Sequence, residues 1–285
     1  KSGIIRRSKM YSRMLTSAIT VGFGGSVGLE APIVVTGSAI GSNVGRLMHL
    51  NYKKRTLLIG CGAAGAISAI FNSPVAGVIF SMEVILADVT IAMFIPLLLA
   101  SVTGALISLT LSGDDVLFSF KLVDSFEAVH TPYYILLGVV CGLVSVYFTR
   151  ITYKVEHLIS KVKNALGRAV MGGILLGIII FVFPPIFGEG YNTIKSLLAG
   201  KGSEILNASL FFGEVENTGI ILVFILGVLL IKPVASALTI GSGGSGGIFA
   251  PSLFLGGITG FLFASSSNLL GWSTMSTSNF TLVGM

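Results

Sequence analysis

The sequence is poor in charge. Only 11% of its 285 residues are Asp, Glu, Lys or Arg, whereas a soluble domain carries about 25%. Hydrophobic residues make up 53%, and the mean hydropathy is +0.93. A membrane-spanning helix needs about 20 apolar residues. Five segments without charge reach or approach that length: 56–82, 89–113, 131–149, 169–188 and 233–285. These features exclude an ordinary soluble domain and predict an all-α polytopic membrane protein.

Cysteine and histidine are also scarce. Cys61 and Cys141 lie in apolar segments, where we expect small core residues rather than a disulfide or a metal pair. His49, His130 and His157 each lie beside a charged or polar loop. The sequence has no H-E-x-x-H or G-x-S-x-G pattern and no cluster of metal ligands. We therefore expect no metal and no cofactor, and the sequence argues against an intramembrane enzyme.

Acidic residues are outnumbered, 12 against 18 Lys and Arg, which gives a net charge of +6. A basic balance can indicate nucleic-acid binding. Here the basic residues form short clusters between apolar segments, at 1–13, 46–55 and 150–168. This is the excess of Lys and Arg found in cytoplasmic loops. The expected partner is therefore a lipid bilayer, in the plasma membrane or a bacterial inner membrane, and not nucleic acid.

Glycine is abundant, and part of it belongs to an internal repeat. The stretch GGSVGLEAP, at 24–32, and the stretch GGSGGIFAP, at 243–251, both fit the pattern G-G-S-x-G-x-x-A-P. Gly37 and Gly41 after the first copy correspond to Gly256 and Gly260 after the second. Paired Gly/Pro-interrupted segments in two halves of a membrane protein indicate the substrate site of an inverted-repeat transporter. We place the halves at 1–125 and 126–285.

Each copy of the repeat reads as a glycine loop followed by a helix that begins near Ala31-Pro32 or Ala250-Pro251. The first turn of such a helix has unpaired backbone N–H groups and a partial positive charge. Two such turns that converge would form an anion site. The pattern predicts that this site works without any buried Lys or Arg, so that an anion is held weakly enough to leave. Glycines and prolines elsewhere predict interrupted helices at Gly60 to Gly65, Asn72-Ser73-Pro74, Pro96, Pro184-Pro185 and Lys232-Pro233.

Glu30 is the one charged residue between Met14 and Gly45. A carboxylate is favoured at a helix start, so it could occupy the amide-lined position that a mobile anion would use, and leave when protonated or displaced. The alternative is a simple helix-capping acid. Ionisable groups inside a membrane are costly and usually functional, which favours a gate. Phe249 holds the equivalent position in the second copy. There its ring could serve for packing, its backbone N–H could face the anion, or both.

At these residues the sequence resembles the CLC family of chloride channels and chloride/proton antiporters. GLEAP resembles the family's G-x-E-G-P gate motif, with Glu30 at the gating glutamate, and GIFAP resembles its G-x-F-x-P motif. FNSPVAGVIFSMEV, at 71–84, resembles the helix after the gate. The resemblance implies an inverted repeat of short, tilted and re-entrant helices, and a homodimer with one chloride pathway in each subunit. The implied anion-site residues are Leu29, Glu30, Ala31, Ile248, Phe249 and Ala250, with loop glycines Gly28 and Gly247.

The sequence departs from the family pattern in three places. Ala31 replaces the usual glycine of the gate motif. The family's first anion loop, G-S-G-I-P, and its pore tyrosine are absent, and no tyrosine follows Tyr191. We therefore expect the middle portion of the family's membrane domain. Its first half would lack its N-terminal helices, its second half would lack its C-terminal helices, and two of four anion-site elements would be missing.

The third departure concerns protons. Antiporters of the family carry an inner proton-relay glutamate at the position of Val84, and valine cannot carry a proton. The neighbouring Glu83 would face about a quarter turn away, so we interpret it as a structural acid. The resemblance therefore favours a passive chloride channel, with a chloride/proton antiporter as the alternative.

Overall fold

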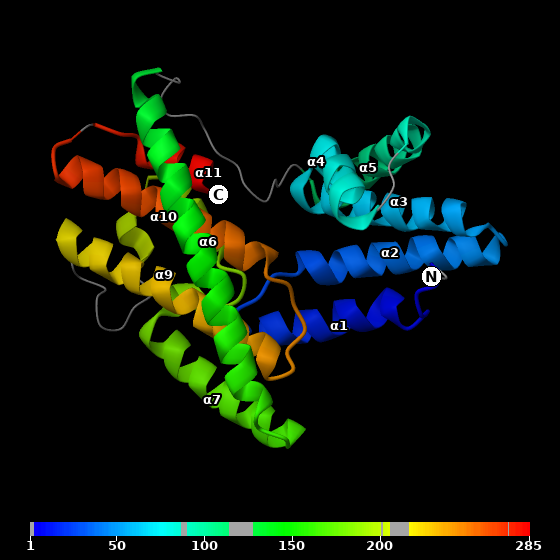
Figure 1. The fold of residues 1–285 in the computed structure, drawn as a ribbon, viewed down its shortest axis with the longest axis horizontal. Helices are drawn as coiled ribbons and strands as arrows, with labels where there is room; N and C mark the ends of the chain where they lie inside the picture. Colours follow the sequence, from blue (N-terminus) through cyan, green and yellow to red (C-terminus); the bar gives the residue numbers. More distant parts are fainter. Residues whose placement is uncertain (1–2, 87–89, 114–127, 201, 206–216, 273) are drawn as a thin grey trace. The chain divides into compact units, whose positions relative to one another are not determined.

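The computed structural model describes residues 3–86, 90–113, 128–200, 202–205, 217–272 and 274–285. These residues form helices and loops, and their one β-type pairing is an isolated bridge (Figure 1). The chain divides into two compact units, Lys1–Ile19 with Leu29–Ser119, and Thr20–Gly28 with Phe120–Met285. The first glycine loop therefore belongs with the second unit. The expected boundary between halves, at 125 and 126, lies outside the described residues and stays a prediction.

The first unit contains most of α1 and the helices up to α5. Their bounds are α1 Lys9–Gly22, α2 Glu30–Leu47, α3 Tyr52–Phe71, α4 Pro74–Phe80 and α5 Ile91–Ser112, with a π-helical turn at Ser81–Ile85. α3 lies at the centre of this unit, because α2, α4 and α5 all pack against it. Its start is capped by the side chain of Asn51, which accepts a hydrogen bond from the Lys54 amide at 3.0 Å.

The second unit contains α6 Thr131–Ser160, α7 Ala165–Val182, α8 Tyr191–Leu198, α9 Thr218–Gly241, α10 Phe249–Leu269 and α11 Thr277–Gly284. Short 3₁₀ turns occupy Ala128–His130, Pro184–Ile186 and Gly202–Ile205. The long helix α6 crosses both α9 and α10 and packs against them (Figure 1). α9 and α10 carry most of the buried residues of this unit.

The glycines downstream of the repeat bring helices into close contact in both units. A Cβ added to Gly37 or Gly41 would collide with the backbone carbonyl of Gly62 or Leu58 on α3. A Cβ added to Gly256 or Gly260 would collide with the carbonyl of Gly284 or Phe280 on α11. Small residues allow helix backbones to approach closely in membranes. The corresponding positions of the two copies therefore perform the same packing task.

Three predicted interruptions are wrong and two are right. One of the wrong ones is at Gly60 to Gly65, because α3 continues through these glycines. Asn72, in the left-handed region with φ 49°, ends α3, and Pro184 begins a 3₁₀ turn after α7. In contrast, Pro96 lies inside α5 and Pro233 lies inside α9, and both helices continue through them. Proline is tolerated within membrane helices because neighbouring groups satisfy the freed backbone carbonyl. Lys232 therefore lies within a continuous helix and not in a break.

Six helices of the described residues are long and apolar enough to cross a membrane: α3, α5, α6, α7, α9 and α10. The most hydrophobic of the six is α9, which is also one of the two most buried. Many apolar side chains on the other helices face outward, including Ile91, Leu111 and Ile135. Outward apolar surface on long helices is what a bilayer solvates. The prediction of an all-α polytopic membrane protein is confirmed.

Candidate functional site

The two glycine loops meet at an antiparallel bridge between Gly28 and Gly247. The Gly28 amide donates to the Gly247 carbonyl, and the Gly247 amide donates to the Gly28 carbonyl, each at 2.9 Å. Both residues hold the same position in the repeat, so the bridge lies where a pseudo-twofold axis would pass between the copies. The two glycine loops, whose equivalent residues are 219 positions apart in the chain, therefore contact each other directly.

A second pair of hydrogen bonds crosses between the loops. The Ser26 amide donates to Thr239 Oγ1 at 3.1 Å, and the Ser245 amide donates to Thr20 Oγ1 at 3.1 Å. Ser26 and Ser245 are equivalent in the repeat, and so are Thr20 and Thr239. Each helix that leads into a glycine loop thus holds the serine of the opposite loop. The four interactions tie the two loops together reciprocally.

The turn that leaves each helix also has the same geometry in both copies. Gly24 and Gly243 have φ of 93° and 105°, a conformation that favours glycine. The next glycine donates its amide to a carbonyl five residues earlier, Gly25 to Thr20 at 2.8 Å and Gly244 to Thr239 at 2.9 Å. A side chain at either position would strike that threonine. The repeated G-G pair is therefore required by the turn itself.

One position of the repeat differs between the copies for a steric reason. Val27 is completely buried, and the equivalent Gly246 lies against it so closely that a Cβ would overlap the valine side chain. Only one of the two loops has room for a side chain next to the bridge. The residues at position x of the G-G-S-x-G pattern thus form a complementary pair. The side chain at this position is large in the first copy and absent in the second.

The repeat extends further upstream than the nine residues identified from sequence. The stretches R-M-L-T-S-A-I-T-x-G at 13–22 and K-P-V-A-S-A-L-T-x-G at 232–241 also align without gaps. The alignment makes Arg13 equivalent to Lys232, and Ser17 equivalent to Ser236. Ser17 and Ser236 are both buried. The structural role of Thr20 and Thr239 could have been found by continuing the comparison toward the N-terminus.

Both predicted helix starts are present, one residue earlier than expected. α2 begins at Glu30 after Leu29, and α10 begins at Phe249 after Ile248. Neither leucine nor isoleucine can cap a helix with its side chain, and each helix has proline at its third position, where a missing N–H costs little. The residue before each helix, Leu29 or Ile248, therefore makes no side-chain cap hydrogen bond.

The predicted anion-site residues are distributed over the two units. Leu29, Glu30 and Ala31 open α2 in the first unit, and Glu30 is only 2% exposed. Ile248, Phe249 and Ala250 open α10 in the second unit, with Ala250 buried and Ile248 half exposed. Gly28 and Gly247, the predicted loop glycines, are the pair that the structure brings into direct contact.

Lys232 is a buried lysine that was not expected from the sequence. The absence of a buried Lys or Arg from the anion site itself stays a prediction. Lys232, in the middle of α9, has no exposed surface. Its Nζ donates to the carbonyls of Gly188 at 3.1 Å and Ile186 at 3.3 Å, and it lies 4.7 Å from the centre of the Phe254 ring on α10. Carbonyl dipoles and an aromatic face allow the cation to exist inside the protein.

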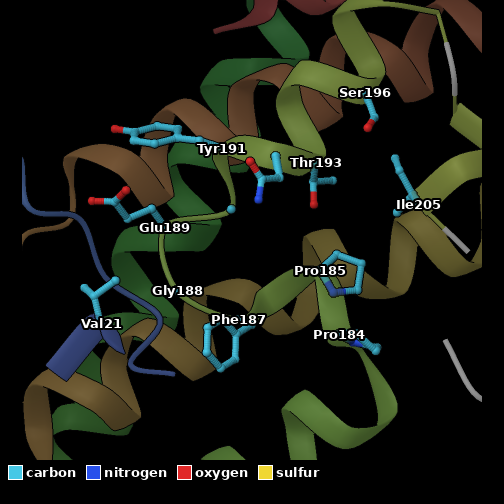
Figure 2. A pocket seen from close by; sticks show the side chains of 12 residues that line it. Val21, Pro184, Pro185, Phe187, Gly188, Glu189, Tyr191, Thr193, Ser196 and Ile205 are labelled. Carbon is cyan, nitrogen blue, oxygen red and sulfur yellow. The ribbon is translucent and has the colours of Figure 1, made fainter. Parts of the chain in front are cut away.

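The segment that accepts from Lys232 borders a cavity of about 450 Å³ in the second unit. The cavity is lined by the end of α1 at Val21, by residues 184–185 and 187–190, by α8, and by Ile205. In Figure 2 the side chain of Glu189 lies between those of Val21 and Tyr191, while Thr193 and Ser196 extend from α8. The wall is thus mixed in character, with one carboxylate and several hydroxyl groups.

The remaining residues singled out from sequence lie away from these loops along the chain. Val84 and Glu83 lie on the π-helical turn and are both exposed. Cys61 and Cys141 are free and partly buried. Within the described ranges, no three His, Cys, Asp or Glu side chains lie close enough to hold a metal ion.

A family model and individual relatives of this chain are all named for chloride channels. Residues 1–285 match the model of the voltage gated chloride channel family. The chain is 32% identical over 269 residues to Chloride channel protein CLC-f of Arabidopsis thaliana, covering 90% of this chain and 32% of that protein. It is 26% identical over 259 residues to the Voltage-gated ClC-type chloride channel ClcB of Escherichia coli, covering 90% and 57%.

Solved structures with the same fold include a slow cyanobacterial Cl⁻/H⁺ antiporter, with a TM-score of 0.78, 23% identity and coverage of 97% of this chain and 62% of that one. A CLC-type fluoride/proton antiporter gives a TM-score of 0.74 and 24% identity, with 95% and 63% covered. The chain spans between 32% and 60% of the length of the curated relatives considered. It is an integral multi-pass membrane protein, and it belongs to the CLC family of voltage-gated chloride channels.

Proposed function

We propose that the protein containing this chain passes chloride, or a similar small anion, through the membrane by a passive channel mechanism. The observation that carries the proposal is the Gly28–Gly247 bridge, which joins two glycine loops that each lead into a helix start. First-turn amides and the helix dipole attract anions. Family membership supports the same substrate class, because the matching family model and relatives are named for chloride channels.

In this proposal, backbone amides hold the anion. The groups assigned to it are the first-turn amides of α2, at Leu29–Ala31, and of α10, at Ile248–Ala250. Neutral amides attract an anion less strongly than a charged side chain in contact would, which permits both entry and exit. The catalytic chemistry of an enzyme is not required, and neither is a cofactor. Chloride is the transported ligand.

Glu30 is the proposed gate. It is buried and stands at the first position of α2, where the helix dipole favours a carboxylate. An ionised Glu30 would compete with the anion for those amides, and a protonated Glu30 would release them. Transport should therefore increase as pH falls, since protonation removes the competitor.

The experiment is a flux measurement on the full-length protein in liposomes. Glu30→Gln is expected to give high chloride flux at every pH, because glutamine cannot ionise. Glu83→Gln, which neutralises an exposed acid, is the matched control and should keep the pH dependence of the original protein. Flux through Glu30→Gln that still falls at high pH would refute the gate.

A chloride/proton antiporter is the second candidate. It is favoured by the two structural neighbours described as antiporters for chloride and fluoride. Val84 opposes it, because this side chain cannot relay a proton at the position that the family uses. Paired measurement of chloride and proton flux decides between them: a channel moves no protons uphill when a chloride gradient is applied.

Two further features of the proposal concern assembly and location. We expect a homodimer in the plasma membrane or a bacterial inner membrane, with a complete pathway in each subunit. Cross-linking in native membranes measures the assembly. A linked species of twice the subunit mass is expected.

A further inference from the structure

The gating scheme proposed above gives the buried side chain of Lys232 no role. It is completely enclosed, and its hydrogen-bond acceptors are two backbone carbonyls, Ile186 and Gly188. Removing an ammonium group from water is costly even when dipoles compensate. Apolar residues of similar volume often replace buried charges without loss of stability. Stability alone is therefore a poor explanation for lysine at this position.

The Ile186 carbonyl connects Lys232 to the first glycine loop. It accepts a hydrogen bond from Lys232 Nζ at 3.3 Å and another from Ser26 Oγ at 2.8 Å. Ser26 is completely buried and precedes Glu30 by four residues. Lys232 and Ser26 thus share one acceptor, and a movement of that carbonyl would affect both.

The backbone of Ser26 is held by the same helix that carries Lys232. The Ser26 amide donates to Thr239 Oγ1 at 3.1 Å, and Thr239 Oγ1 donates to the Ala235 carbonyl at 2.9 Å. α9 therefore fixes Ser26 twice, once directly through Thr239 and once through the Ile186 carbonyl. Lys232 also lies over Phe254 on α10, the helix that begins at the second motif.

We propose that Lys232 is a positioning residue for the anion site. Its two hydrogen bonds hold the 186–188 backbone in the place where Ser26 can bind it, and this contact fixes the glycine loop that leads into α2. The lysine acts through Ser26 and the loop, and does not touch the anion. The inference rests on the proposed function, because the site it positions is the anion site assigned there.

The test separates this role from a purely electrostatic one. Lys232→Met removes the hydrogen bonds and the charge while keeping the length of the side chain. Ser26→Ala removes the bond to the shared carbonyl and leaves the charge in place. Lys232→Arg keeps both charge and donors. Ser236→Ala is the matched control, because Ser236 is also completely buried on α9 and its hydroxyl has no hydrogen-bond partner in the described residues.

Chloride flux is measured against chloride concentration for each variant of the full-length protein in liposomes. A loss of chloride binding free energy equal to about one hydrogen bond corresponds to about a tenfold change in the affinity for chloride. Lys232→Met should therefore raise the half-saturating chloride concentration about tenfold, and Ser26→Ala should raise it in the same direction. The double variant should be no worse than Lys232→Met, because both act through one carbonyl. Lys232→Arg and Ser236→Ala should match the original protein.

Three results would overturn the inference. If Lys232→Met weakens chloride binding while Ser26→Ala does not, the charge acts through space and positioning is wrong. If maximal flux falls while the half-saturating concentration is unchanged, the lysine has only a structural role. Ser26→Ala and Lys232→Arg keep the test decisive if Lys232→Met does not fold. Glu30→Gln is measured in parallel: if it loses pH dependence while Lys232 and Ser26 act independently, the proposed function stands and this inference fails.

Discussion

Thr20 and Thr239 each bind the backbone amide of the serine in the other's glycine loop. The two distances are equal at 3.1 Å, and the two threonines are equivalent in the internal repeat. Each threonine thus accepts a hydrogen bond from the loop of the other copy, beside the Gly28–Gly247 bridge. Because each loop depends on the helix of the other copy, neither loop can keep its conformation independently. This reciprocity holds the two glycine loops together within the second unit.

The crossed bonds predict equal effects for the two threonines. Thr20→Val and Thr239→Val keep the side-chain shape but leave a serine amide without its acceptor. An unsatisfied buried donor costs about 1–3 kcal/mol. Thermal unfolding of the purified protein should show a similar loss for both variants. Thr259→Val is the control, because Thr259 is buried on α10 and donates to the Leu255 carbonyl of its own helix. A large loss for one threonine and none for the other would contradict the reciprocal arrangement.

The pairing of Val27 with Gly246 predicts a rescue. Gly246→Val should destabilise the protein by about 1–3 kcal/mol, the range for overpacking a core. Val27→Gly should also destabilise it, because the buried side chain leaves a cavity. The double variant restores one side chain and one glycine and should recover much of the stability. Gly173→Ala, where an added Cβ has open space, should cost little. Additive losses in the double variant, measured by thermal unfolding, would reject the complementary pair.

The downstream glycines predict matching effects in the two units. Gly41→Ala and Gly260→Ala each force a Cβ against a backbone carbonyl of the next helix. Backbone cannot yield as a flexible side chain does, so each variant should lose about 1–3 kcal/mol or more. Gly142→Ala on α6, with nothing near the added Cβ, is the control. The yield and melting temperature of the purified variants measure the effect. Tolerance of alanine at both positions would disprove close helix packing there.

The sequence predicted the class of protein and the two loops that precede helices α2 and α10, because both depend on local features. Charge depletion identified the membrane, and the G-G-S-x-G-x-x-A-P pattern identified two loops followed by helices. The helix starts were predicted to within one residue, at Ala31 for α2 and Ala250 for α10, because proline and glycine mark such starts strongly. These signals depend on a few neighbouring residues and do not require knowledge of the tertiary structure.

The features that were missed depend on contacts between distant segments. Lys232 was expected in a helix break because Pro233 follows it, but α9 continues and buries the ammonium. Its partners, Ile186 and Gly188, are backbone carbonyls more than 40 positions away, and carbonyls carry no sequence signal. Thr239 was overlooked because a threonine in an apolar helix commonly bonds its own backbone, which it also does here.

The surroundings of Val84 yield the last prediction, on proton coupling. Val84 is 60% exposed on the π-helical turn, and Glu83 beside it is also exposed. Glu83 projects about a quarter turn away from Val84, so it is not placed to act in the position of the missing relay. Neutralising it by Glu83→Gln should therefore leave both chloride flux and proton movement unchanged. Proton flux in liposomes with an imposed chloride gradient measures this. If the original protein drives protons uphill and Glu83→Gln abolishes that movement, Glu83 is a relay, and the antiporter replaces the channel as the mechanism.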